Sequence, residues 1–190
     1  PEGDGIEVTD VSRMRRAIAD GTILSKSNIP HFYVTVSMDV DALLKLRKEI
    51  NATLESEGIK VSVNDMLIKA AALTLRKFPN LNSHYYGDKI VSYTDINIGV
   101  SVALPNNGLI NVVAHNADKR SLSDLAAANI EMYTRAREGK IKPADTKGAT
   151  FTISNLGAYG VDHFAAIISA PEAGMLAIGT AKKVPVVKDN

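Results

Sequence analysis

Four histidines are the side chains in this sequence that could transfer protons near neutral pH. His31 follows a proline and opens an apolar stretch, a position that favours a backbone hydrogen bond over catalysis. His84 precedes Asp88 by four residues, a spacing at which a carboxylate could orient an imidazole, but the tyrosines around it favour an exposed hairpin residue. His115 and His163 have no obvious partner in the sequence.

Ser154 is the hydroxyl most suitably placed for chemistry. It ends the alternating stretch ATFTIS, with Asn155 next to it and Gly157 shortly after. Because of this position, its hydroxyl could project from the end of a strand into a cleft. No Gly-x-Ser-x-Gly elbow surrounds it. Two roles remain open from the residues alone: a hydrogen-bond donor to an oxyanion, and a hydroxyl that caps a turn.

Several other chemistries lack the residues they require. The histidines are scattered, no His-Glu-x-x-His pair occurs, and there is no cysteine, so the sequence predicts no metal site. Neither Gly-x-Gly-x-x-Gly nor Gly-Lys-Ser/Thr is present, which argues against nucleotide hydrolysis. Without cysteine the chain has no disulfide and no thiol nucleophile, so a substrate or cofactor must supply any sulfur chemistry.

Helical spacing of apolar residues predicts four helices that would support these side chains. We expect a short first helix that Gly21 ends, and capping-box starts at Ser62-x-x-Asp65 and at Ser121-x-x-Asp124. The four expected helices cover residues 10–21, 40–54, 62–78 and 121–138.

Two-residue alternation predicts strands in the rest of the chain. The clearest is Phe32–Met38, which we expect to form a long strand after Pro30. A hairpin is expected where the turn at 105–108 joins two apolar runs. The other expected strands lie in residues 82–87, 89–94, 95–104, 109–114, 149–154, 165–169 and 175–180. Long helices with mostly adjacent strands predict an α+β fold, in which helices cover a mixed sheet.

The length of the chain indicates the number of domains, and its net charge limits the kinds of partner. A chain of 190 residues predicts one domain. The net charge of 22 − 21 = +1, with both signs interleaved, excludes a basic stripe for nucleic acid or an anionic membrane. No apolar run approaches the roughly 20 residues that span a bilayer, so we expect a soluble, intracellular protein. Residues 1–7 are interpreted as the end of an interdomain linker in a larger parent protein, and residues 8–190 as the folded domain.

Five longer segments resemble, in the same order, the catalytic domain of dihydrolipoamide acyltransferases, the core components of 2-oxo acid dehydrogenase complexes. The matching segments are residues 25–51, 60–85, 98–113, 137–143 and 148–179, and the similarity extends from about Val8 to the end. The resemblance implies a two-layer fold similar to chloramphenicol acetyltransferase. It also implies a homotrimer with active sites at its subunit interfaces, and further assembly of trimers into a hollow core.

The resemblance also implies a reaction: acyl transfer between dihydrolipoamide and coenzyme A, with acetyl expected because the sequence looks closest to pyruvate-type members. Coenzyme A would be a co-substrate, and a separate domain would carry the lipoyl group. In this family a histidine of a His-x-x-x-Asp-Gly motif acts as general base, and a serine or threonine that matches Ser154 stabilises the oxyanion. Implied partners are lipoyl domains and the other enzymes of the complex. The implied compartment is the cytoplasm in a bacterium or the mitochondrial matrix in a eukaryote.

The sequence departs from the family pattern at two places. It reaches VPVVKDN without a His-x-x-x-Asp-Gly motif, so these 190 residues alone are expected to be inactive. An incomplete or truncated chain would explain this, and the alternative is a non-catalytic structural core subunit that serves assembly only. In addition, Asp20 and Gly21 lie where the family commonly has a basic residue, which argues against a contact of this arm with coenzyme A phosphates.

Overall fold

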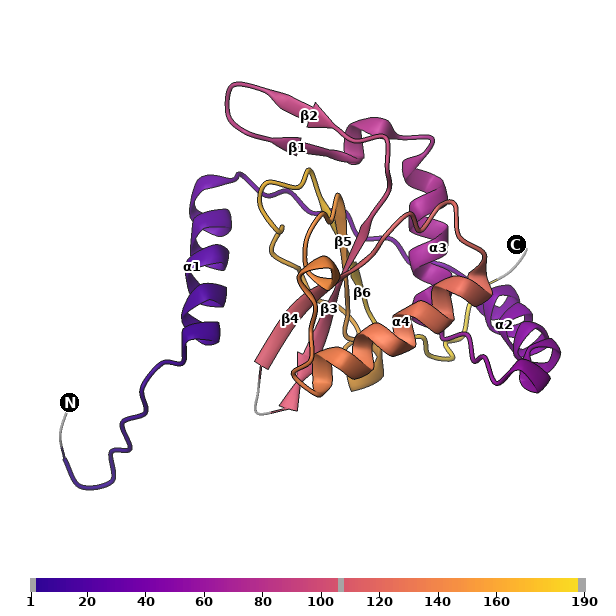
Figure 1. Cartoon of the computed structure of the whole chain (residues 1–190), viewed down its shortest axis with the longest axis horizontal. Coiled ribbons are helices and arrows are strands. Elements are labelled where there is room, and N and C mark those ends of the chain that lie inside the picture. Colours follow the sequence, from indigo (N-terminus) through magenta and orange to yellow (C-terminus); the bar gives the residue numbers. More distant parts are fainter. Residues whose placement is uncertain (1–2, 106–107, 188–190) are drawn as a thin grey trace.

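The computed structural model describes residues 3–105 and 108–187. Four α-helices and two small groups of strands make up this part of the chain (Figure 1). The helices are α1 (Arg13–Asn28), α2 (Asp41–Thr53), α3 (Val63–Leu75) and α4 (Leu122–Arg137). The strands are β1 (Ser83–Tyr85), β2 (Ile90–Ser92), β3 (Ile98–Leu104), β4 (Gly108–Ala114), β5 (Phe151–Asn155) and β6 (Met175–Ile178).

A mixed four-stranded sheet with the order β4-β3-β5-β6 forms the centre of the fold. β3 and β4 form an antiparallel hairpin, which confirms that prediction, whereas β3 with β5 and β5 with β6 are parallel. Residues 106 and 107 of the expected turn lie outside the described residues. β1 and β2 form a separate antiparallel hairpin. The expected α+β class with helices on a mixed sheet is therefore confirmed.

The hydrophobic core lies between one face of this sheet and helices α3 and α4, and α4 crosses the sheet in Figure 1. Alternate residues of β3 point into the core, and Val100 lies beside Ile153 of β5 on the same face. Residues that are at most 7% exposed fill this space: Ile68, Ala72, Leu75, Ile98, Val100, Val102, Val112, Leu125, Met132, Ala136 and Ile153. The opposite face of the sheet therefore carries the side chains that alternate with these.

Two helices begin where the capping signals place them. The Ser62 hydroxyl accepts from the Asp65 amide, and the Asp65 carboxylate accepts from the Ser62 amide at 2.8 Å, which is a complete capping box. At the start of α4 the Ser121 hydroxyl accepts from the Asp124 amide at 3.1 Å. Helix α2 also matches its predicted range within one residue at either end.

Two predicted strands are absent from the described residues. Residues 30–39 run as an extended segment without a hydrogen-bonded neighbour strand, and the Phe32, Val34, Val36 and Met38 side chains are at least 70% exposed. Residues 165–169 form no strand either. Alternation alone does not make a strand, because a strand also needs a neighbour within hydrogen-bonding distance, and these segments have none among the described residues.

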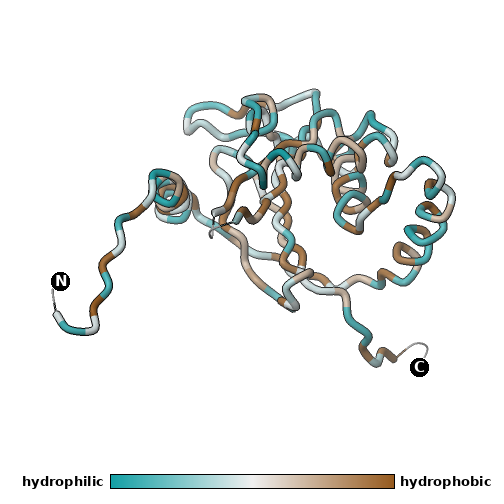
Figure 2. The backbone as a smooth tube through the Cα atoms, turned by 60° about the horizontal axis from the view of Figure 1, so that its bottom comes forward, coloured by the Kyte–Doolittle hydropathy of each residue, from teal (hydrophilic) through white to brown (hydrophobic). Residues whose placement is uncertain are grey.

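The first helix is longer than predicted, because Gly21 does not end it. Gly21 lies inside α1, which continues to Asn28. Tertiary contact outweighs the low helix propensity of glycine, because the buried Ser25 hydroxyl donates to the Ile168 carbonyl at 2.6 Å and fixes the second half of the helix. Before α1 the chain is extended and exposes Ile6, Val8 and Val11, and Figure 2 shows hydrophobic positions along this arm, away from the core.

Candidate active site

Ser154 lies near the carboxyl end of β5, on the face of the sheet that points away from α3 and α4. Its neighbour Ile153 points into the core, so Ser154 and Thr152 share the opposite face. Ser154 is half-buried, and it is paired with Ala177 of β6 in the parallel ladder. None of the described residues forms a hydrogen bond with its hydroxyl. The position therefore holds a serine hydroxyl that is fixed by a strand and free to donate to a ligand.

A buried hydrogen bond holds the middle of β5. The Thr152 hydroxyl donates to Oε1 of Glu172 at 2.8 Å, and both residues are buried. Gly99 makes this contact possible, since a Cβ at that position would lie 2.5 Å from the Thr152 Oγ1. Burial raises the pKa of Glu172 to about 7, and its Oε2 has no partner among the described residues. No local signal marks Glu172 as a buried carboxyl group, because its burial depends on contacts with distant residues.

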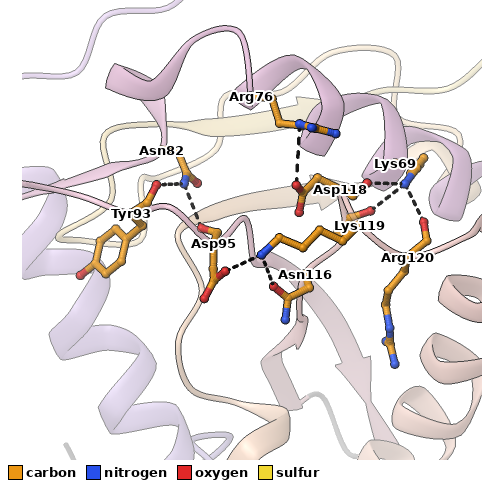
Figure 3. A network of polar contacts seen from close by, with 10 residues as sticks. Lys69, Arg76, Asn82, Tyr93, Asp95, Asn116, Asp118, Lys119 and Arg120 are labelled. Atoms are coloured by element: carbon orange, nitrogen blue, oxygen red, sulfur yellow. Dashed lines mark hydrogen bonds and ion pairs between the residues drawn. The ribbon is translucent and has the colours of Figure 1, made fainter.

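The start of β5 is held by a second buried contact. The Thr150 hydroxyl donates to Oδ1 of Asn82 at 2.6 Å, and both side chains are buried. Asn82 in turn donates from Nδ2 to the Tyr93 and Asp95 carbonyls, at 2.9 and 3.0 Å (Figure 3). The strand that carries Ser154 is thus connected to both sides of the β1–β2 hairpin.

A polar network, drawn in Figure 3, fixes the loop after β4. The Lys69 ammonium group donates to three carbonyl oxygens of the loop, those of Ala117, Asp118 and Arg120, at 2.6 to 3.2 Å. Lys119 donates to Asp95 at 2.8 Å, and this hydrogen bond raises the pKa of the lysine. Because these cations are already bound by the protein's own oxygens, we assign the network a structural role.

Ser169, in the segment that follows β5, contacts the face of the sheet that carries Ser154. Ser101 and Asn111 lie on this face, where the Ser101 hydroxyl donates to Oδ1 of Asn111 at 2.9 Å. Asn111 donates from Nδ2 to the Ser169 hydroxyl at 3.3 Å, which connects the sheet to this segment. The Ile168 amide donates to Nε2 of His31 at 3.1 Å. Residues 168 and 169 therefore connect this face of the sheet with α1 and His31.

His31 and His84 both make hydrogen-bond contacts with other parts of the fold. Both ring nitrogens of His31 are used, because Nδ1 lies 2.7 Å from the Ile29 carbonyl and Nε2 accepts from Ile168, as the predicted backbone role requires. The expectation that His84 is exposed is wrong, since only 8% of it is exposed. Its Nδ1 lies 3.0 Å from the Tyr93 hydroxyl, and burial lowers its pKa. The burial arises because His84 pairs with Glu172 across an isolated bridge, a contact that joins segments 88 residues apart.

The other two histidines are near the surface. Nε2 of His115 lies 2.9 Å from the Ala144 carbonyl, and His163 is exposed. No hydrogen bond connects any of the four histidines with Ser154 in the described part of the chain. The site thus contains a candidate oxyanion donor that has no hydrogen-bonded base among the described residues.

The described residues also bear on two other kinds of site, one for a metal ion and one for a membrane. No group of three or more histidine, aspartate or glutamate side chains is arranged to hold a metal ion there. None of the described helices combines the length and the apolar character that a membrane crossing requires.

Known proteins resemble this chain over nearly all of its length. Residues 4–190 match the family described as 2-oxoacid dehydrogenases acyltransferase (catalytic domain). The dihydrolipoyllysine-residue acetyltransferase component of pyruvate dehydrogenase complex from Zymomonas mobilis is 46% identical over 180 residues. That alignment covers 95% of this chain but 41% of the relative, so the chain spans less than half of the length of that protein.

Solved structures share the fold. The dihydrolipoamide acetyltransferase of Azotobacter vinelandii, studied for the catalytic role of a serine, a histidine and an asparagine, superposes with a TM-score of 0.92 at 32% identity. The match covers 98% of this chain and 79% of that one. The cubic core of the pyruvate dehydrogenase multienzyme complex gives the same TM-score, identity and coverage. The two-layer, chloramphenicol acetyltransferase-like fold expected from the resemblance is confirmed by these matches.

Proposed function

Because this chain belongs to the family of 2-oxoacid dehydrogenase acyltransferase catalytic domains, we propose that it transfers an acetyl group between dihydrolipoamide and coenzyme A. The observation that supports this proposal best is the free, half-buried Ser154 hydroxyl at the end of β5, in a chain 46% identical to an acetyltransferase component of pyruvate dehydrogenase complex. Coenzyme A acts as co-substrate, and the lipoyl group arrives on a separate domain. We propose that residues 8–190 form the acyltransferase domain and that residues 1–7 end a linker.

Ser154 stabilises the charge that develops during transfer. A thiol attacks the carbonyl carbon of the acyl thioester, and the carbonyl oxygen takes the negative charge of the tetrahedral intermediate. A hydroxyl fixed by a strand donates to this oxygen without reorganisation, and one such donor contributes about 2.7–4 kcal/mol to the transition state. When the intermediate collapses, the other thiol leaves as thiolate and takes up the proton that was removed from the attacking thiol.

The general base of this reaction is proposed to lie outside residues 1–190. His31 uses both of its ring nitrogens in backbone contacts, and His84 is buried against Tyr93. His115 contacts a carbonyl, and His163 is exposed. The sequence contains no His-x-x-x-Asp-Gly motif. Residues 1–190 alone are therefore expected to transfer negligible acetyl.

Assembly into a homotrimer, and of trimers into a larger core, is supported by exposed apolar surface. The Phe32–Met38 segment presents four apolar side chains to solvent, and the arm before α1 presents Ile6, Val8 and Val11. Contiguous apolar surface of this kind indicates a protein interface. Partners are lipoyl domains and the other enzymes of a pyruvate dehydrogenase complex. By the same family relation, we place the protein in the cytoplasm of a bacterium or the mitochondrial matrix of a eukaryote.

The test compares Ser154→Ala with a matched control in the full natural chain that contains these residues. We expect Ser154→Ala to lower kcat about 100- to 1,000-fold with little change in KM, because its hydrogen bond forms mainly in the transition state. The control is Ser101→Ala on the same face, whose hydroxyl already donates to Asn111. Acetyl transfer from acetyl coenzyme A to dihydrolipoamide is measured for both variants.

Three outcomes would contradict the proposal. An unchanged kcat in Ser154→Ala would reduce Ser154 to a structural hydroxyl. Inactivity of the full natural chain would favour a structural core subunit without catalysis. Rapid turnover by residues 1–190 alone would show that the base lies within them.

A further inference from the structure

Asn155 follows Ser154 directly and points to the opposite face of β5. Its Nδ2 donates to Oδ1 of Asn64 in α3 at 3.2 Å, and its Oδ1 accepts from the Gly157 amide at 2.8 Å. One side chain therefore connects the end of the strand to a helix on the far face, and also closes the turn that follows.

The turn after Ser154 is confined from its other side by the end of β6. The Leu156 amide donates to the Ile178 carbonyl at 3.0 Å, so the backbone stays paired one residue beyond the strand. A Cβ on Gly157 would lie 2.8 Å from the Gly179 carbonyl oxygen, which shows how closely the two segments approach. The turn after Ser154 is therefore held by the end of β6 on one side and by the Asn155 side chain on the other.

The helix that receives Asn155 is itself firmly anchored. Asn64 lies next to Asp65, whose Oδ2 accepts from the Ser62 amide at 2.8 Å in the capping box. Oδ1 of Asp65 accepts from Nδ2 of Asn129 in α4 at 2.7 Å, and both of these side chains are buried. Asn64 is thus held on the first turn of a helix that is fixed to α4, and it can serve as a reference point for β5.

We infer that Asn155 is a positioning residue that directs the Ser154 hydroxyl by holding the end of β5 between α3 and the following turn. The inference rests on the proposed role of Ser154 as oxyanion donor. An oxyanion donor must lie within about 2.7–3.1 Å of the developing charge, and displacement of about 1 Å can cost about 100-fold in rate. A misdirected hydroxyl loses transition-state stabilisation while substrates still bind.

The main test is Asn155→Ala in the full natural chain, measured by the acetyl transfer reaction. We expect kcat to fall at least about tenfold and KM to stay within about twofold. Asn155→Asp should restore most of kcat, because its carboxylate still accepts from Gly157 and the Asn64 amide can turn its NH₂ group toward it. The matched control is Asn51→Ala, because Asn51 makes two comparable bonds to the Val61 backbone, at 3.0 and 2.8 Å, far from β5 in sequence. This control should lose stability and keep kcat.

A double variant separates the inference from the proposed function. If Asn155 acts through Ser154, Asn155→Ala should lower kcat no further once Ser154→Ala is present. If Ser154→Ala lowers kcat but Asn155→Ala does not, the proposed function stands and the positioning inference is overturned. If Ser154→Ala leaves kcat unchanged, both are overturned.

Amide hydrogen exchange gives a readout that does not depend on activity. In residues 1–190, Asn155→Ala should speed exchange of the Gly157 amide by about tenfold or more, because its acceptor is removed, whereas Asn51→Ala should leave it unchanged. Equal exchange at Gly157 in the wild type and in Asn155→Ala would overturn the inference.

Discussion

Residues 32–38 and residues 98–104 carry the same alternation of apolar and small or polar side chains, but they occupy opposite environments. The second stretch is β3, which has β4 on one edge and β5 on the other, and its Ile98, Val100 and Val102 are at most 7% exposed. The first has no neighbour strand among the described residues, and its apolar side chains are at least 70% exposed. Alternation thus defines two faces of an extended segment, but a neighbouring strand and a covering layer decide whether the apolar face is buried.

The largest effect should come from shortening a side chain on the buried side of this comparison. Ile98→Ala should reduce the free energy of unfolding by about 2–5 kcal/mol, because it leaves a cavity in the core. Val34→Ala should change the stability of the isolated subunit by less than about 0.5 kcal/mol. Urea unfolding of both variants at low protein concentration measures the difference.

Unfolding measurements at several protein concentrations test the prediction for Val34→Ala further. If the 32–38 segment is covered when subunits assemble, the cost of Val34→Ala should grow with concentration, and sedimentation should show weaker association. A large cost at Val34 that does not depend on concentration would mean that the segment packs within its own subunit, against the comparison.

The buried region also contains a carboxyl group, Glu172, whereas residues 32–38 contain none. Burial raises its pKa from 4.5 to about 7. Below pH 4.5 the group is protonated in both states, and between pH 4.5 and about 7 the unfolded chain loses the proton while the folded protein keeps it. Its contribution to stability is therefore complete at low pH and is lost as the pH rises toward 7.

Glu172→Gln should remove this pH dependence. The free energy of unfolding of the variant minus that of the wild type should increase from pH 4.5 to 7 by up to about 3 kcal/mol. Urea unfolding at a series of pH values measures it. Parallel curves for the two proteins would show that Glu172 is not desolvated in solution.

Smaller effects than those of Ile98→Ala are expected for two glycines, Gly99 in β3 and Gly21 in α1. Gly99→Ala places a Cβ 2.5 Å from the Thr152 Oγ1 and should cost about 1–3 kcal/mol through overpacking. Gly21→Ala meets nothing within 4 Å in α1 and should stabilise the helix by about 0.5–1 kcal/mol. Thermal unfolding measures the change in melting temperature for both variants. A decrease for Gly99→Ala and an increase for Gly21→Ala would support the comparison. Equal shifts in melting temperature would contradict it.

Local signals in the sequence predict those elements whose causes are local. Capping residues at Ser62 and Ser121 mark helix starts, and the apolar runs of β3 and β4 lie close enough to pair as a hairpin. The Phe32–Met38 strand was predicted wrongly because a neighbouring strand is not a local property. The continuation of α1 past Gly21 has the same cause, a contact between Ser25 and a carbonyl 143 residues away.

The residues of the candidate site also differ in whether their roles follow from local sequence or from contacts with distant residues. Ser154 is visible in the sequence, because it ends an alternating stretch that resembles a known family. The contact of Asn155 with Asn64 joins residues 91 positions apart, and the burial of His84 depends on a bridge to Glu172. Such contacts follow from the pairing of β5 with its neighbours, which no periodicity within a short window can reveal.

The parallel pairing of β3 with β5 has a consequence for the order of folding. Ile98 pairs with Phe151 across 53 positions, and α4 lies between them. The β3–β4 hairpin closes a short loop and needs no later part of the chain. Pairing of β5 with β3 instead closes a long loop that includes α4, and contacts of high sequence separation are slow to form. We therefore expect the Ser154 strand to enter the sheet late during synthesis on the ribosome, after the edge that receives it has already formed.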